Sequence, residues 1–373
     1  MFVLMHKDIE VANIQIQHDK NNNPYLHVQQ IINKQLMPWG TKKSSMEQLD
    51  KNFSEWNDSR CIPFGRPNYD IFLSRVGVSS NAELIAISHM CSLTDCYWFR
   101  DEKASTTWKD VNFRDNGINS NIYQMLFLRQ EATGFDNLNS PDLTTDGNLP
   151  KMWIQKNDDF YLIKSNEKMA IDDACAELIA SEIFNYLQIP CVDYTIENHN
   201  NNICSVCKCF ISSNDEEFVP IYNLFIDSGM NSIQDFVNFL RNNGFDDDLS
   251  KMFCGDFIIG NIDRHAKNYG IIIDADTGNI KRFAPLFDHG NSDLFNDISF
   301  MNYHPTGSSF DKIDLSPLSN IDKSHFLTHI KNVLSQTPYS ELEQKEIIDR
   351  VANRVDSVLE KAIERDELND REY

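Results

Sequence analysis

The segment "GNIDRHAKNYGIII", residues 260–273, places an acid, two bases, a histidine and an amide within six positions between two apolar runs. The preceding run, "LSKMFCGDFIIGN", has helical spacing, whereas "YGIIID" is typical of a short buried strand. A turn, "ADTGN", then leads into "IKRFAPLFDHGNSD", residues 280–293. The sequence therefore predicts two short strands, with Asp263 and Asn268 before the first and Asp288 after the second.

The chain upstream supplies further polar groups in a fixed order. Residues 131–150, "EATGFDNLNSPDLTTDGNLP", are turn formers without helical or strand periodicity, and loops of that length tend to be functional or disordered. A predicted hairpin, residues 151–165, follows and carries Lys164 near its end. Next come a predicted helix, "IDDACAELIASEIFNYLQ", which contains Glu177, and two strands, "CVDYTIE" and "ICSVCKCFI".

Phosphoryl transfer from ATP requires such parts in this order. A loop covers the phosphates, a strand lysine positioned by a helix glutamate holds them, a carboxylate orients the attacking hydroxyl, and an Asn and a second Asp hold metal. The kinase catalytic loop separates its Asp and Asn by five positions, and Asp263 and Asn268 share that spacing. Each feature alone is common on protein surfaces. Their ordered combination favours a site for ATP, Mg²⁺ and a hydroxyl.

The same residues resemble a known family. "GNIDRHAKNYGIII" followed by "FAPLFDHG" is similar to the signature of the HipA-like serine/threonine kinases, whose catalytic loop reads D-x-H-x-x-N. "SPDLTTDG", "YLIK", "AELIASEIFNYLQIP" and "VCKCFI" resemble the loop, strand, helix and hinge of that family, so the similarity is specific over about 140–295. It implies an α+β, two-lobed protein-kinase-like fold of the HipA and phosphoinositide-kinase type, with an additional N-terminal α/β subdomain.

This resemblance predicts three parts along the chain. Residues 1–130 would form the N-terminal α/β subdomain, and 131–213 an ATP-binding N-lobe with the phosphate-covering loop. Residues 214–373 would form a helical C-lobe that contains the catalytic loop. The C-lobe would end in an amphipathic helix, "ELEQKEIIDRVANRVDSVLEKAIERDE", that packs through one apolar stripe.

The resemblance also implies roles for individual residues of the catalytic segment. Asp263 would orient the substrate hydroxyl, His265 would support the loop, and Lys267 would stabilise the transferred phosphate electrostatically. Asn268 and Asp288 would hold Mg²⁺. The ordinary alternatives are that His265 is a satisfied loop histidine and that Lys267 is a solvated surface residue.

Nucleotide binding is assigned to residues further upstream. By the same resemblance, Lys164 would hold the ATP phosphates, Glu177 would pair with it, and backbone groups near Cys209 and Ile211 would hold adenine. Arg264 has no role in this scheme, and it would anchor either a phosphate or an acidic neighbour.

The sequence departs from conventional kinases in two motifs. "DHG" stands in place of D-F-G, and no G-x-G-x-x-G occurs, so the phosphate-covering loop would be "SPDLTTDG". Serines of this loop can be autophosphorylated in the HipA-like family, which disables ATP binding. The candidates here are Ser140, Thr144 and Thr145, and the alternative is that these hydroxyls cap turns.

Composition disfavours several classes of partner. Lys and Arg total 34 against 56 Asp and Glu, a net charge of −22, which disfavours nonspecific binding to nucleic acids or to anionic membranes. No apolar run is long enough for a membrane span or a signal peptide. Nine cysteines without such a signal indicate reduced thiols in a cytoplasm. A zinc site at Cys204, Cys207 and Cys209 is less favoured than a strand with structural cysteines.

The function expected from the sequence is an ATP- and Mg²⁺-dependent serine/threonine protein kinase that modifies a protein hydroxyl and its own 131–150 loop. The best-known members of the family are toxins held by a DNA-binding antitoxin, so an antitoxin partner is an implied alternative. The protein would act in the bacterial cytoplasm, or in a host cytosol as a secreted effector. Other readings are a small-molecule or lipid kinase on the same fold and a nucleotide-binding pseudokinase. The complete set of Lys164, Asp263, Asn268 and Asp288 disfavours a pseudokinase.

Overall fold

The computed structural model of the protein describes residues 1–118, 122, 126–127, 138–165, 172–199, 202–228, 233–295 and 321–369. The chain divides into two compact units. The first unit consists of Met1–Glu167, His199–Gly229 and Ile271–Arg282. The second consists of Lys168–Asn198, Met230–Gly270 and Phe283–Tyr373. A boundary at residue 130, or at 213, stays a prediction.

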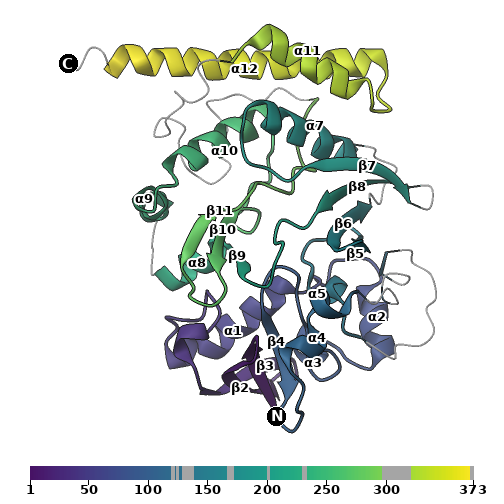
Figure 1. Ribbon diagram of the computed structural model, residues 1–373, viewed down its shortest axis with the longest axis vertical. Helices are drawn as coiled ribbons and strands as arrows, with labels where there is room; N and C mark the ends of the chain where they lie inside the picture. Colours follow the sequence, from purple (N-terminus) through teal and green to yellow (C-terminus); the bar gives the residue numbers. More distant parts are fainter. Residues whose placement is uncertain are drawn as a thin grey trace. The chain divides into compact units, whose positions relative to one another are not determined.

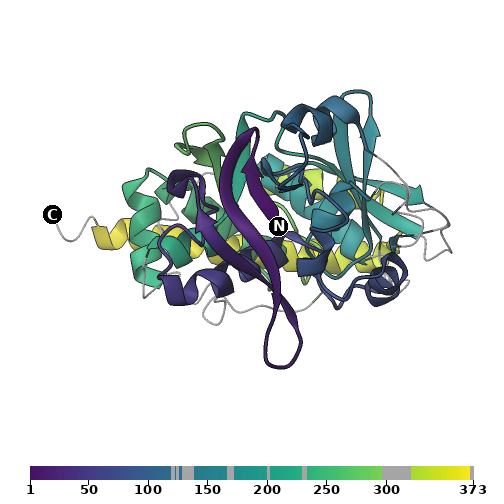
Figure 2. The ribbon, with the colours of Figure 1, turned by 90° about the horizontal axis from the view of Figure 1, so that it is seen from below.

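The first unit begins with an antiparallel sheet. Strands β1 (Phe2–His6), β2 (Ile9–His18), β3 (Pro24–Ile31) and β4 (Tyr97–Asp101) lie in the order β3-β2-β1-β4. Figure 2 shows β2 and β3 as a long twisted hairpin at the N-terminus. The segments "VANIQIQ" and "PYLHVQQI" form most of β2 and all of β3.

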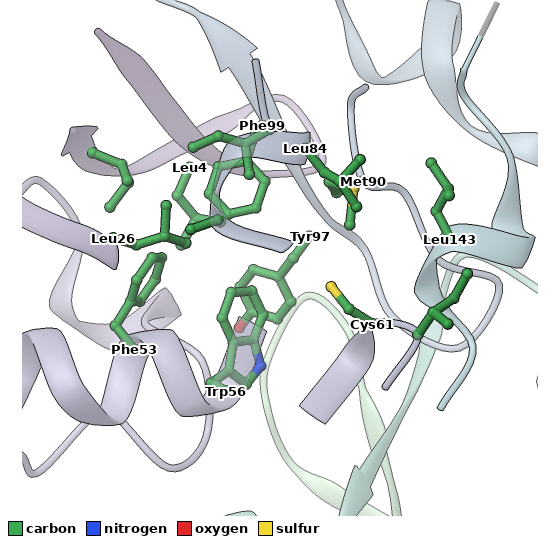
Figure 3. Close-up of a cluster of buried hydrophobic side chains, with 14 of the residues drawn as sticks. Leu4, Leu26, Phe53, Trp56, Cys61, Leu84, Met90, Tyr97, Phe99 and Leu143 are labelled. Carbon is green, nitrogen blue, oxygen red and sulfur yellow. The ribbon is translucent and has the colours of Figure 1, made fainter. Parts of the chain in front are cut away.

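The sheet is accompanied by helices, most of them short. They are η1 (Lys34–Leu36), α1 (Met46–Arg60), α2 (Tyr69–Val76), α3 (Asn81–Leu84), α4 (Trp108–Val111) and α5 (Phe113–Asn116). Helix α1 packs on β3 through Phe53 and Trp56, which join Leu4 and Phe99 of the sheet in a buried cluster (Figure 3). The same cluster contains Leu143, from the predicted phosphate-covering loop. The core of the N-terminal sheet therefore extends to that loop.

The described part of the loop is ordered around a 3₁₀ helix, η2 (Pro141–Thr144). The Leu143 carbonyl accepts from Ile62 N at 3.3 Å, and Thr144 Oγ1 donates to the Cys91 carbonyl at 2.7 Å. The expectation of a structureless loop is wrong for these residues, because an apolar side chain and backbone hydrogen bonds fix them on the core. Residues 131–137 lie outside the described residues.

Two further sheets confirm the hairpins predicted from the sequence. One has the order β5-β6-β8-β7, from β5 (Lys151–Lys156), β6 (Asp159–Ser165), β7 (Tyr194–His199) and β8 (Asn202–Lys208). The other has the order β11-β10-β9, from β9 (Glu216–Pro220), β10 (Gly270–Asp274) and β11 (Ile280–Phe283). Helix α8 (Ile221–Ser228) follows β9. Cys204 and Cys207 are buried within β8 and Cys209 just after it, which confirms the strand reading of these cysteines.

The second unit is mainly helical. Its helices are α7 (Asp172–Tyr186), α9 (Ile233–Asn242), α10 (Asp246–Ile259), α11 (Lys323–Leu334) and α12 (Glu341–Asn369). Helix α10 packs on α7 and α12, and α11 packs on α7 and α12, as Figure 1 shows for the long α12. The predicted amphipathic C-terminal helix is thus confirmed, and its fully buried stripe is Ile347, Val351, Val355 and Val358.

Two expectations from composition can be compared with the structure. All nine cysteines lie in the described part of the chain, and no disulfide joins any of them. Within the described residues, no helix combines the length and the apolar character that crossing a bilayer requires.

Close packing between α10 and α7 depends on Gly255. A Cβ atom built on Gly255 would lie 2.5 Å from Phe184 Cε1 and 2.9 Å from Ile189 Cδ1. Such distances are far below van der Waals contact, so only glycine permits this approach of the two helices. The next residue on α10 is the buried Asp256.

We expect Gly255→Ala to lower the free energy of unfolding by about 1–3 kcal/mol, because overpacking outweighs the roughly 1 kcal/mol gain in helix propensity. Urea denaturation measures the change. Asp247→Ala, at an exposed position of the same helix, is the control and should change stability by no more than about 0.5 kcal/mol. Equal or greater stability of Gly255→Ala would show that the helices can separate without cost.

Candidate active site

The segment from Asp263 to Asn268 is a tight loop at the end of α10. The helix stops at Gly260, whose φ of 68° is left-handed, as is common at helix ends. Asp263 N donates to Asn261 Oδ1 at 3.0 Å, and the Asn268 side-chain amide donates to the Asp263 carbonyl at 3.2 Å. The first and last residues of the predicted catalytic motif are therefore held together by the loop's own hydrogen bonds.

His265 and Lys267 are the more accessible residues of this loop. His265 is exposed, and its Nδ1 accepts from Lys267 N at 3.3 Å, while its carbonyl accepts from Asn268 N at 2.9 Å. Lys267 is half-buried. The contacts of His265 agree with the predicted supporting role, and a chemical role for Lys267 stays a prediction.

Arg264 points into the protein and is fully buried. Its Nε and Nη2 donate to the two carboxylate oxygens of Asp256 on α10, each at 2.9 Å. Nη1 donates to the carbonyls of Asn268 at 3.0 Å and Phe287 at 2.6 Å, and Nη2 also donates to His289 Nδ1 at 2.9 Å. A guanidinium has five N–H donors, and these five hydrogen bonds satisfy all of them. Of the two alternatives for Arg264, the structure selects the acidic neighbour.

The "DHG" turn carries Asp288 in a strained conformation. Its φ of 62° lies in the left-handed region, which is uncommon for a residue with a side chain and is often found at functional sites. Asp288 N donates to the Tyr194 hydroxyl at 3.1 Å. The next residue, His289, is fully buried and packs edge-on against Phe184 with ring centroids 4.9 Å apart. Because arginine only donates, His289 Nδ1 is the acceptor, and the ring must be protonated at Nε2.

The two segments share one pattern. In each, a half-buried carboxylate, Asp263 or Asp288, precedes a fully buried anchor, Arg264 or His289. The two anchors bind each other. The carboxylates are consequently fixed to a common internal support while they themselves stay partly accessible.

Glu177 of α7 and Asn291 complete this group. Glu177 Oε2 accepts from His289 N at 2.9 Å, and Glu177 is itself buried. Asn291 Nδ2 donates to Asp263 Oδ2 at 2.8 Å, which orients that carboxylate. The structure thus brings together Glu177, Asp263, Asn268 and the Asp288 turn within the second unit.

The remaining predicted site residues belong to the first unit. Lys164 lies on β6 opposite Lys151 and Ser205, and it is buried, which argues against a solvated surface lysine. Its pairing with Glu177 stays a prediction. Cys209 N donates to the Phe160 carbonyl at 2.8 Å, and the Ile211 carbonyl accepts from Arg114 Nη2 at 2.6 Å. These two backbone groups are engaged within the protein, so adenine would need other groups of the same segment.

The three predicted phosphorylation sites serve structural roles in this conformation. Ser140 is 2% exposed, and its Oγ caps η2 by accepting from Asp142 N at 3.2 Å. Thr144 Oγ1 donates to backbone carbonyls, and Thr145 Oγ1 accepts from Trp153 Nε1 at 2.8 Å. The alternative that these hydroxyls cap turns therefore agrees with their hydrogen bonds in the structure.

Charged groups are buried around this segment. Burial raises the pKa of Asp142 to about 6, although its carboxylate accepts from Trp153 N and Ser140 Oγ. Burial also lowers the pKa of Arg66 to about 10, and Arg66 donates to the carbonyls of Thr145 and Gly147. The segment is fixed by polar groups that lose solvation, which makes it sensitive to any added charge.

The side-chain oxygens of Asn268 and Asp288, in the second unit, are suitable ligands for a magnesium ion. Mg²⁺ prefers carboxylate and amide oxygens, with water and phosphate oxygens completing its shell. Asn268 uses its amide nitrogen to bind the Asp263 carbonyl, so its side-chain oxygen is the atom left to face a cation. Asp288 would supply a carboxylate oxygen from the neighbouring turn.

Sequence reasoning missed Asp256, His289 and Asn291. Asp256 is the one charged residue within the buried run "MFCGDFII", and a buried carboxylate requires a partner. That signal was available in the sequence. The partner could not be identified, because Arg264 stands among polar residues that look solvated.

Comparisons with known proteins agree with this fold. No family model matches the chain. The serine/threonine-protein kinase CtkA of Helicobacter pylori strain J99 is 26% identical over 160 residues, which are 38% of this chain and 49% of that relative. The chain thus spans about half the length of the curated relative that it matches.

Solved structures give a wider match. HipA of Shewanella oneidensis MR-1, from a toxin–antitoxin complex with HipB and operator DNA, superposes with a TM-score of 0.58 and 13% identity over 99% of both chains. The crystal structure of the proinflammatory kinase CtkA of Helicobacter pylori gives a TM-score of 0.48 and 18% identity over 58% of this chain and 95% of that one. The match to HipA shows the fold, and the resemblance to the HipA-like kinases and the kinase-like fold class are both confirmed.

We expect Arg264→Lys to lower the free energy of unfolding by at least about 2 kcal/mol, because an ammonium cannot replace five fork-shaped donors and leaves buried acceptors unpaired. Chemical denaturation measures the loss. Arg241→Lys is the matched control, since Arg241 pairs with Asp246 at 2.6 Å near the surface and should matter by less than about 0.5 kcal/mol. Similar effects of the two substitutions would mean that the buried network is not a stabilising support.

Proposed function

We propose that the protein is an ATP- and Mg²⁺-dependent serine/threonine protein kinase. The observation that carries this proposal is the buried Arg264 network, which holds the motif Asp263–Asn268 and the Asp288 turn against each other. Asp263, Asn268 and Asp288 are held in place by a buried charge network and by a left-handed backbone, and both cost free energy. Such costs are typical of functional sites rather than of ordinary surface loops. The similarity to a serine/threonine-protein kinase over part of the chain supports the same activity.

In this proposal Asp263 acts on the substrate hydroxyl. Its Oδ2 is held by Asn291, so the carboxylate has a defined orientation in which to accept a hydrogen bond and then the proton. When bound between Asn268 and Asp288, Mg²⁺ would neutralise charge on the phosphate oxygens. Lys267 stabilises the charge of the transferred phosphoryl group. Lys164, paired with Glu177, holds the remaining phosphates of ATP.

The substrate class is a protein carrying a serine or threonine hydroxyl, and the site of action is a cytoplasm. The net charge of −22 supports a protein rather than an anionic lipid surface as substrate. An antitoxin partner would accompany a toxin role, by analogy with the HipA structure that was solved together with HipB.

We expect Asp263→Asn to abolish transfer of labelled phosphate from ATP while Mg²⁺-ATP still raises its melting temperature as in the wild type. The carboxylate acts on the hydroxyl in the transition state, so its loss appears in kcat rather than in nucleotide binding. Asp288→Ala should instead lose most of the thermal shift, because it removes a metal ligand.

Asp247→Asn, at an exposed position of α10, controls for the loss of one carboxylate. This variant should retain both phosphate transfer and the thermal shift with Mg²⁺-ATP. Near-wild-type transfer by Asp263→Asn, on a substrate that the wild type modifies, would refute the assignment of the catalytic loop. A wild type that binds Mg²⁺-ATP and modifies nothing would point to a binding module.

We further propose that autophosphorylation of the 131–150 segment switches the enzyme off. Ser140 Oγ lies 3.2 Å from Asp142 Oδ2 in a buried site, so a phosphate there would meet a carboxylate away from water. Like charges at that distance repel strongly when they are desolvated. The modified segment could not keep the closed packing that fixes Leu143 in the core.

Mass spectrometry after incubation with Mg²⁺-ATP should find phosphate on Ser140, Thr144 or Thr145 in the wild type and none in Asp263→Asn. An Asp at the modified position should weaken ATP binding and increase proteolysis within 138–150. The exposed Thr277 serves as a reference, and equal phosphate on Thr277 would indicate unselective modification. Absence of phosphate from the segment in an active wild type would remove the switch.

A further inference from the structure

Three buried side chains of the first unit meet in a cluster that has no part in the candidate active site. They are His6 at the end of β1, Cys96 just before β4 and Glu217 on β9, and each is at most 3% exposed. His6 Nε2, Cys96 Sγ and a Glu217 carboxylate oxygen all lie within 4.8 Å of one another. In the part of the chain that the structure describes, this is the one group of histidine, cysteine and acidic side chains with such geometry.

The backbone fixes the three ligands independently of their side chains. Lys7 N donates to the Cys96 carbonyl at 3.1 Å, which joins the end of β1 to the start of β4. Phe218 N donates to the Thr94 carbonyl at 2.8 Å, which brings β9 alongside the same segment. The stretches that carry His6, Cys96 and Glu217 are about a hundred residues apart in sequence. These backbone hydrogen bonds hold them together without an ion.

We infer that His6, Cys96 and Glu217 bind a zinc ion. An imidazole nitrogen, a thiolate and a carboxylate oxygen are the three ligand types of protein zinc sites, and together they exclude the hard cations Mg²⁺ and Ca²⁺. Tetrahedral zinc bonds of about 2.0–2.3 Å place ligand atoms roughly 3.3–3.8 Å apart. The observed group needs only small side-chain shifts to reach that spacing.

The existing hydrogen bonds show where the ion would enter. Glu217 Oε1 accepts from His6 Nε2 at 2.9 Å, and Cys96 Sγ donates to the Asn214 carbonyl at 3.4 Å. Zinc would replace the thiol proton of Cys96, which leaves to solvent, and His6 would bind as a neutral imidazole through Nε2 with its ring proton on Nδ1. The Asn214 carbonyl or a water molecule would occupy the fourth position.

A second ligand shell is already present. Cys96 N donates to Glu217 Oε1 at 2.7 Å, and the His6 ring packs edge-on against Tyr97 with centroids 4.8 Å apart. Hydrogen bonds such as the one from Cys96 N to Glu217 orient the ligands of metal sites. Since the ligands are buried and come from β1, the β4 edge and β9, the ion would fasten β9 to the N-terminal sheet as a structural site.

The test uses the full chain, stripped of metal with a chelator and then titrated with Zn²⁺ or Co²⁺. We expect one equivalent of metal per chain, a higher melting temperature with Zn²⁺, and a thiolate-to-cobalt charge-transfer band with Co²⁺. Cys96→Ser should lose the band and the thermal shift. Cys91→Ser, also a fully buried cysteine but outside the group, should keep both.

A second measurement does not depend on a folded variant. In the wild type, Zn²⁺ should slow alkylation of Cys96 several-fold, as followed by peptide mass spectrometry, and leave Cys91 unchanged. Failure of the stripped chain to take up either metal would overturn the site and leave a hydrogen-bonded cluster. Equal cobalt bands in Cys96→Ser and Cys91→Ser would place the metal elsewhere and overturn it too.

Discussion

The candidate active site depends on the buried ion pair between Arg264 and Asp256. Removing two charges from water is costly, and a buried pair is tolerated only when its geometry is good and its other polar atoms are satisfied. Here both carboxylate oxygens and all five guanidinium donors have partners, at 2.6–3.0 Å. Three of those partners belong to the catalytic loop and the "DHG" turn. The charge pair therefore fixes the catalytic loop and the "DHG" turn to the same buried support.

The network explains why accessible and buried residues alternate along both segments. A carboxylate that must meet a cation or a hydroxyl cannot be held by its own contacts alone, because those contacts would compete with the ligand. Placing the anchor one residue later solves this problem. Arg264 fixes the backbone of Asp263, and His289 fixes that of Asp288, whose left-handed φ persists because the surroundings determine it.

Much of the fold was predictable because it depends on local patterns. The hairpin at 151–165, helix α7 and the strands around the catalytic motif follow from periodicity and turn residues, and the motif itself predicted which polar groups gather in the second unit. The internal supports were not predictable. Arg264 looks solvated in a polar loop, and Leu143 sits among turn formers, but tertiary contacts bury both. His6, Cys96 and Glu217 form no motif, because only the sheet brings them together.

His289 gives the "DHG" turn a property that a phenylalanine would not. In protein kinases the packing of the D-F-G phenylalanine sets active and inactive states, and an apolar ring can leave its pocket without breaking a hydrogen bond. His289 keeps ring packing against Phe184 and Tyr194 and also accepts from Arg264. Moving it outward would leave a buried guanidinium donor unpaired, at a cost of about 1–3 kcal/mol. The position of Asp288 is thus coupled to the catalytic loop by a hydrogen bond between Arg264 and His289 as well as by ring packing.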